Sequence, residues 1–153
     1  MNHQMVSSEL SAREAVRDLL ARYTWAGDRG RSAELAACFL VDGVLDVGDH
    51  GGRWEGRAEI QRQLDAVAER IAAAGGGAGP VHHHVSSVLI DLLDTTSAEV
   101  RAYFCVFTDV GADHWGTYRD RVELDHADGT WRFASRSVRV LGHAPGSRFV
   151  PDA

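Results

Sequence analysis

Four long segments rich in β-branched and aromatic residues fill the carboxy-terminal half of the chain, and they constrain its fold more than any other feature. They cover residues 81–93, 98–109, 115–125 and 130–141. Short polar or glycine-containing links separate them. Strands joined by links this short pair with their sequence neighbours in an antiparallel arrangement. We therefore predict an antiparallel meander over this half of the chain.

The amino-terminal half instead shows helical periodicity, with apolar residues at helical spacing over 16–23 and again over 60–71. Ser11 followed by Glu14 forms a capping-box pattern that predicts where the first helix starts. Glycines just after Asp28 predict its end. Helices followed by a continuous sheet indicate the α+β class, in which the helices cover one face of a curved sheet.

Shorter elements are predicted between the two long helices. Ser32 can cap a short helix that extends through Leu40, and an apolar strand follows at 44–47. Glycines at 51–52 predict a hairpin into a second short strand at 53–55.

The length of 153 residues supports one domain with a single core. We predict a flexible lead-in at 1–10, the folded domain at 11–142 and a carboxy-terminal tail at 143–153. The glycine-rich stretch at 75–80 is interpreted as a loop within the domain.

The charge balance excludes several classes of function. A formal net charge of −6 argues against nucleic acid as a partner, because nucleic-acid-binding domains concentrate positive charge. The chain contains no lysine, which excludes Schiff-base catalysis and a P-loop. It shows neither a signal-peptide pattern nor an apolar run long enough to cross a membrane, so we expect a cytoplasmic protein. Cys38 and Cys105 lack metal-site or redox spacing and are interpreted as small buried apolar residues.

Alternation along the strands assigns side chains to faces. In the third long segment, Tyr118 and Asp120 share the apolar, inward face. In the fourth, Arg139 falls on the inward parity with the aromatic residues, while Arg132 and Arg136 point away. A carboxylate on the inward face is costly unless it has a partner.

An acid and an imidazole are the candidate catalytic groups. Asp28 ends the first helix, and the run 82–84 places three consecutive histidines on a strand, so that His83 faces one side while His82 and His84 face the other. Taken alone, His83 could be a hydrogen-bonded core histidine and Asp28 a helix-terminal cap. His82 and His84 could bind a metal, but no third ligand has recognisable spacing, so we expect neither metal nor cofactor.

Five motifs in this order and spacing resemble the SnoaL-like branch of the NTF2-like superfamily, over roughly residues 10–142. They are Tyr23-x4-Asp28, the sequence His-His-Val-Ser-Ser at 83–87, Gly116-Thr-Tyr118-Arg-Asp120, Asp128-Gly-Thr-Trp131-Arg-Phe and Arg136-Ser-Val-Arg139. That branch includes scytalone dehydratase, hexachlorocyclohexane dehydrochlorinase and bile acid 7α-dehydratase. The resemblance implies a cone-shaped α+β barrel that admits a hydrophobic small molecule at its open end.

The resemblance also implies roles for individual residues. In the lyases of this group an Asp-His pair transfers the proton, which here falls on Asp28 and His83. Tyr23 matches a tyrosine of the dehydratase sites, and Arg139 matches an arginine of the bile acid enzyme. That enzyme's strand aspartate meets Val106 here. Further side chains are expected to contact the substrate: Trp25, Phe104, Trp115, Tyr118, Asp120 and His84.

The predicted function is therefore a cofactor-independent lyase that removes a proton from a hydrophobic cyclic substrate and expels a leaving group. An isomerase or polyketide cyclase of the same fold would use the same base without expelling a group. A third possibility is a non-catalytic small subunit of a ring-hydroxylating dioxygenase, since these share the fold. In each case we expect homodimers or homotrimers, because an uncovered apolar sheet is an association surface.

Overall fold

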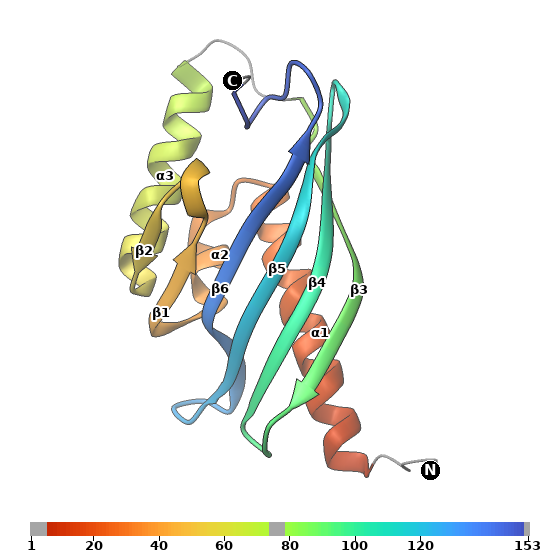
Figure 1. Ribbon diagram of the computed structural model, residues 1–153. Helices are drawn as coiled ribbons and strands as arrows, with labels where there is room; N and C mark the ends of the chain where they lie inside the picture. The colour runs from red at the N-terminus through yellow and green to blue at the C-terminus, as the bar shows by residue number, and fades with distance from the viewer. Residues whose placement is uncertain (1–5, 74–78, 152–153) are drawn as a thin grey trace.

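The computed structural model describes residues 6–73 and 79–151. The helices in these ranges are α1 (Ser7–Asp28), α2 (Ser32–Ala37) and α3 (Arg57–Ala73). The first two strands are β1 (Phe39–Asp46) and β2 (Arg53–Glu55), joined by the 3-10 turn η1 (Gly48–His50). The remaining strands are β3 (His82–Leu92), β4 (Ser97–Thr108), β5 (Gly111–Asp125) and β6 (Thr130–His143). Figure 1 shows α1 packed across one face of the long strands, with α3 beside the two short strands.

The sheet has six strands in the order β2-β1-β6-β5-β4-β3. Strands β3 to β6 form the predicted antiparallel meander. Strand β1 pairs with β6 in parallel, which makes the sheet mixed. The predicted α+β class, with helices on a curved mixed sheet, is confirmed. The sheet stays open, because β2 and β3 are separate edges rather than neighbours that close a barrel.

Helix α1 begins at Ser7, four residues before the predicted start at Ser11. The Glu9 carboxylate accepts a hydrogen bond from the Val6 backbone N–H at 3.3 Å, so an earlier acid serves the helix start. The Ser11 hydroxyl instead donates to the Ser7 carbonyl within the helix. Residues 7–10 of the predicted lead-in are therefore helical, and residues 1–5 lie outside the described part of the chain.

The short helix α2 ends at Ala37, so Phe39 and Leu40 belong to β1 rather than to the helix. Tertiary pairing decides this boundary, since the Phe133 backbone N–H donates to the Cys38 carbonyl and Phe39 aligns with Phe133 across the sheet. The Ser32 hydroxyl bonds the Asp65 carboxylate of α3 and does not cap its own helix. The predicted hairpin at 51–52 is present, and residues 75–78 of the glycine-rich stretch lie outside the described residues.

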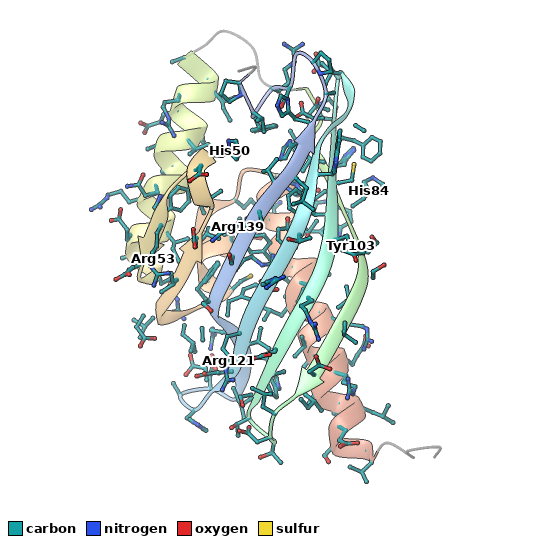
Figure 2. All side chains as sticks on the ribbon, in the orientation of Figure 1. His50, Arg53, His84, Tyr103, Arg121 and Arg139 are labelled. Carbon is teal, nitrogen blue, oxygen red and sulfur yellow. The ribbon has the colours of Figure 1, made fainter. Side chains whose placement is uncertain are left out.

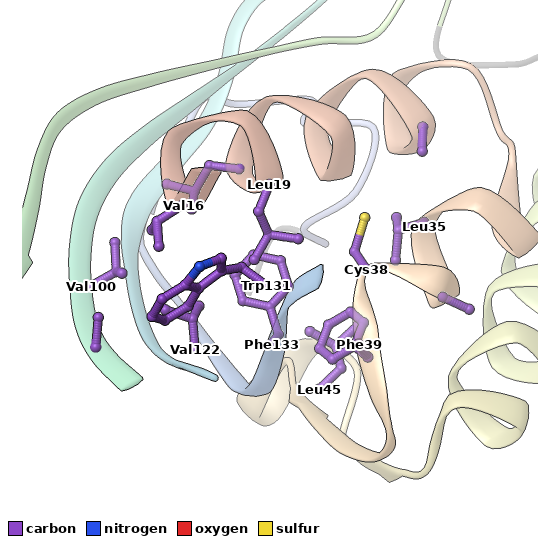
Figure 3. Close-up of a cluster of buried hydrophobic side chains, with 14 of the residues drawn as sticks. Val16, Leu19, Leu35, Cys38, Phe39, Leu45, Val100, Val122, Trp131 and Phe133 are labelled. Atoms are coloured by element: carbon purple, nitrogen blue, oxygen red, sulfur yellow. The ribbon is translucent and has the colours of Figure 1, made fainter. Parts of the chain in front are cut away.

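The core lies between α1, α2 and the inner face of the sheet (Figure 3). Its fully buried members include Val16, Phe39 and Phe133. Cys38 also lies in this core, and burial raises the pKa of its thiol to about 11. Cys105 is half-buried on the opposite face of the sheet, which corrects its interpretation as a core residue.

Three long strands contain β-bulges, which place one extra residue against the partner strand. The extra residue is Ser87 or Val88 in β3 and Asp113 in β5, while β6 has two, Ala134 and Leu141. Each bulge shifts the alternation of side chains by one position and increases the local bend of the sheet. Residues on the two sides of a bulge therefore reach the inner face with opposite parity.

Candidate active site

The imidazole of His83 and the carboxylate of Asp28 are in direct contact. His83 Nδ1 lies 2.5 Å from Asp28 Oδ1. The backbone N–H of His83 also donates to the same carboxylate, at 3.1 and 3.2 Å from its two oxygens. The predicted contact between the end of the first helix and the middle histidine is thus present, across 55 positions of sequence.

Asp28 occupies the last residue of α1, where the helix dipole disfavours a negative charge. Its carboxylate binds strand β3 rather than the end of its own helix, so the contact with His83 explains its position better than capping does. An N–H at Nδ1 that donates to Asp28 leaves Nε2 of His83 free to accept a proton. The His83 side chain keeps 27% of its surface exposed, so the ring is partly accessible.

A pocket of about 300 Å³ lies between α1 and β3, with His83 in its wall. Trp25, a predicted substrate contact, lines the same pocket and stacks against the Arg29 guanidinium at 4.3 Å. The other lining residues are Arg17, Leu20, Ala21, Thr24, Val85 and Val88. A groove of about 800 Å³ lies along α1 and α2 near the β5–β6 turn, but neither His83 nor Asp28 lines it.

Aromatic rings fill the inner face next to the pair. Tyr23 packs edge-on against Tyr118 at 6.4 Å, and Phe104 stacks on Tyr118 at 4.7 Å. Burial raises the pKa of the Tyr23 and Tyr118 hydroxyls, so both remain protonated donors at neutral pH. The negative charge of Asp28 also raises the pKa of Tyr118, so the carboxylate and the phenol interact electrostatically. Tyr118 therefore lies on the predicted inward face, and Tyr23 of α1 and Phe104 of β4 pack against it.

Asp120 faces inward as predicted, and its partner is Arg136. The guanidinium donates two hydrogen bonds to the carboxylate, at 2.9 Å from Nε and 2.8 Å from Nη2, and both side chains are fully buried. The guanidinium carbon lies 4.2 Å from the ring centre of Tyr23 and 4.1 Å from that of Tyr118. Nη1 of Arg136 is buried and has no hydrogen-bond partner among the described residues.

The chain matches the SnoaL-like domain family over residues 8–137. It belongs to that family. No curated protein matches the chain. Solved structures do, and the SnoaL-like chain shares the cystatin-like, NTF2-like fold with them, which confirms the predicted fold family.

Three of these structures have TM-scores of 0.73 to the SnoaL-like chain. An NTF2-like protein with a cystatin-like fold from Novosphingobium aromaticivorans is 25% identical, over 91% of this chain and 88% of that one. A candidate scytalone dehydratase from the same organism is 22% identical, over 97% and 99%. A hexachlorocyclohexane dehydrochlorinase from Novosphingobium barchaimii is 18% identical, over 95% and 98%.

The prediction that Arg139 faces the site of this SnoaL-like chain is wrong. Arg139 is exposed on the outer face of the sheet, where Nη2 donates to Asp46 at 2.9 Å (Figure 2). The physical reason is the bulge at Ala134, which shifts the alternation of β6 so that Arg136, rather than Arg139, is directed inward. The same bulge explains why uninterrupted alternation assigns Arg136 to the wrong face.

Two predicted substrate contacts also lie on the outer face. Trp115 is 41% exposed and pairs with Cys105 of the neighbouring strand β4. His84 is exposed and packs edge-on against Phe107 at 4.8 Å (Figure 2). His84 directly follows His83 in β3, so the two side chains point to opposite faces of the sheet. Trp115 shares the face of His84, because both residues pair with Cys105 of β4.

The described residues contain no group of three or more histidine, cysteine or acidic side chains placed to hold a metal ion. Within the same part of the chain, none of the helices combines the length and apolar character that crossing a bilayer requires.

Proposed function

We propose that the chain is a small-molecule lyase in which His83 is the general base and Asp28 its orienting partner. The observation that carries this proposal is the 2.5 Å contact between His83 Nδ1 and Asp28 Oδ1 beside a mostly apolar pocket. Membership of the SnoaL-like family, and structural similarity to a hexachlorocyclohexane dehydrochlorinase, support the same class of reaction.

In the proposed reaction, Nε2 of His83 removes a proton from a carbon beside an activating group. The Asp28 carboxylate stabilises the imidazolium that forms. The electron pair of the broken C–H bond forms a double bond, and the leaving group departs from the adjacent carbon with its bonding electron pair. A halide leaves as the anion, whereas a hydroxyl group takes the proton back from the His83 imidazolium and leaves as water. The side chains of this chain supply each proton transfer without a cofactor.

Arg136 takes the role expected of Arg139 in this proposal. Its buried Nη1 is a charged donor without a hydrogen-bond partner among the described residues, and the guanidinium lies over the ring of Tyr23. Donors fixed in a water-poor site stabilise the negative charge that develops on an activating oxygen or a leaving group. Asp120 holds the guanidinium in place through its other edge.

The test is a substrate screen by mass spectrometry with matched variants. Cyclic β-hydroxyketones report loss of water, and halogenated cyclohexanes report loss of hydrogen halide. We expect His83→Ala and Asp28→Asn each to lower turnover by about 10³–10⁴-fold, since the pair acts as a unit. His84→Ala is the control, because His84 lies on the other face of the strand.

Turnover of His83→Ala within a few fold of the wild-type rate would remove the pair from the mechanism. A product of unchanged mass would instead indicate the isomerase or cyclase that uses the same base. Co-purification with a larger enzyme whose activity survives Asp28→Asn and His83→Ala would indicate a non-catalytic subunit.

A further inference from the structure

The pocket that contains His83 follows one face of α1. Its lining residues on the helix are Arg17, Leu20, Ala21, Thr24 and Trp25. They repeat at three- and four-residue intervals, the spacing of a single helix face, and Asp28 continues the same row. Its lining residues on the strand are His83, Val85 and Val88. The pocket is therefore a groove between α1 and β3, with charged or titratable groups at its ends and mostly apolar groups between them.

Two contacts place α1 antiparallel to β3 and so give the direction of this groove. His83 Nδ1 lies 2.5 Å from Asp28 at the end of the helix, and Arg13 Nη1 donates to the Ile90 carbonyl at 2.6 Å. Between these contacts α1 rises by roughly 22 Å, and the strand spans a similar length. Arg17 lies one turn from Arg13 and roughly 16 Å along the axis from Asp28. It therefore stands at the end of the groove opposite His83.

Two arginines on α1, Arg13 and Arg17, make this end of the groove positive. In the part of the chain that the structure describes, neither forms an ion pair with a carboxylate. The carboxylate of Asp18 is instead bonded to Arg22 at 2.6 Å. Nε of Arg13 is buried and lacks a hydrogen-bond partner among the same residues. Like charges one turn apart on a helix repel each other, so an anion bound here would offset an unfavourable interaction.

The rest of the groove determines which kind of anion fits. Leu20 is buried, and the half-buried Val85 and Val88 pack against the core, so the middle of the groove suits an apolar body. The Asp28 carboxylate at the other end repels a second negative charge, which directs an acid group toward Arg17. Arg17 is exposed, and a guanidinium can donate two parallel hydrogen bonds to a carboxylate.

We infer that Arg17 is a specificity-determining residue that binds the carboxylate of an apolar carboxylic acid, at the end of the groove opposite His83. The acidic C–H and the carboxylate of the substrate are then on the order of 10 Å apart, since contacts of about 3 Å at each end take up the rest of the helical span. This inference rests on the proposed function for the position of the reacting carbon, but its test measures binding alone.

The test compares two probes of equal size that differ in charge, 4-(2-naphthyl)butanoate and 4-(2-naphthyl)butanamide. At low ionic strength we expect the wild-type protein to bind the acid about fivefold more tightly, the effect of one accessible ion pair. The net charge of −6 disfavours an anion elsewhere on the protein. In Arg17→Gln the ratio should fall to about one or below, because glutamine keeps part of the apolar stem and loses the charge. Arg70→Gln is the control, since Arg70 is exposed on α3, outside this pocket, and the ratio should not change.

A second measurement locates the apolar body of the probes. In a histidine-labelled sample, both probes should shift the ring resonances of His83 in long-range proton–nitrogen spectra and leave those of His84, on the other face of β3, unmoved. Absence of binding, a wild-type ratio near one, an unchanged ratio in Arg17→Gln, or unmoved His83 resonances would overturn the inference. Loss of the preference in Arg17→Gln together with full turnover in His83→Ala would retain the carboxylate contact and remove the proposed base.

Discussion

The backbone of Ser87 has a φ of 52°. Among the described residues, Ser87 is the only one other than glycine with a positive φ. This region crowds a side chain against its own backbone, and glycine adopts it with little cost. The strained residue belongs to the β3 bulge, where Ser87 and Val88 together face Ala102. The bulge lets Val85 and Val88 both pack inward although they are an odd number of positions apart.

Replacing Ser87 by glycine should therefore stabilise the protein. We expect Ser87→Gly to raise the free energy of unfolding by about 0.5–1 kcal/mol in urea titrations, because it removes the left-handed strain. Ser86→Gly is the control and should lower stability by a similar amount, since Ser86 has no positive φ and glycine weakens a regular strand. Equal destabilisation by both changes would contradict the role of backbone strain at Ser87.

Strands β5 and β6 are joined inside the fold by the Asp120–Arg136 pair. The bulge at Ala134 brings Arg136 to the inner face, where its charge depends on one carboxylate. A buried charge left without its partner costs far more than the intact pair contributes. The pair is therefore a structural requirement of these strands, and it fixes the guanidinium whose Nη1 has no partner in the described part of the chain.

Asp120→Asn should lower the free energy of unfolding by about 3–5 kcal/mol, because it leaves the Arg136 guanidinium without a neutralising charge. Replacing both members, as Asp120→Leu with Arg136→Met, should recover most of this loss. Chemical unfolding monitored by tryptophan fluorescence measures both. A double variant less stable than Asp120→Asn would show that the pair contributes net stability.

The whole molecule exposes an apolar patch on the sheet face away from α1. The patch comprises Tyr103, Phe107, Trp115 and Leu141, whose side chains are 39–70% exposed. Charged and polar side chains occupy the same face toward the other end of the strands, including Arg101 and Arg119. Apolar groups gathered on one part of a sheet face indicate an association surface between copies of the chain.

We expect the protein to be a homodimer or homotrimer, with this patch at the contact between subunits. Leu141→Arg should shift it to monomer in sedimentation velocity experiments at micromolar concentration, because a buried unpaired charge opposes association. Val41→Arg is the control, since Val41 is 76% exposed on β1, outside the patch. A monomeric wild-type protein at 100 μM, about the range of weak association, would contradict this expectation.

The strands, the long helices and the pairing of the meander could be predicted from the sequence, because they depend on local periodicity and short links. The contact of His83 with Asp28 could be predicted as well, since a helix end and a strand residue were matched to a known motif order. Helix boundaries were less accurate. The start at Ser7 and the passage of Phe39 into β1 depend on hydrogen bonds to partners that local patterns do not contain.

The sequence by itself determined which residues could alternate along each strand, and hence that Tyr118 and Asp120 share the inner face and that His83 and His84 point to opposite faces. Only the tertiary structure decided where that alternation shifts. The bulges at Ala134 and Asp113 arise because neighbouring strands of a curved sheet differ in length, a property of the assembled sheet and not of either strand. These two extra residues turn Arg136 inward and bring Asp113 against His114.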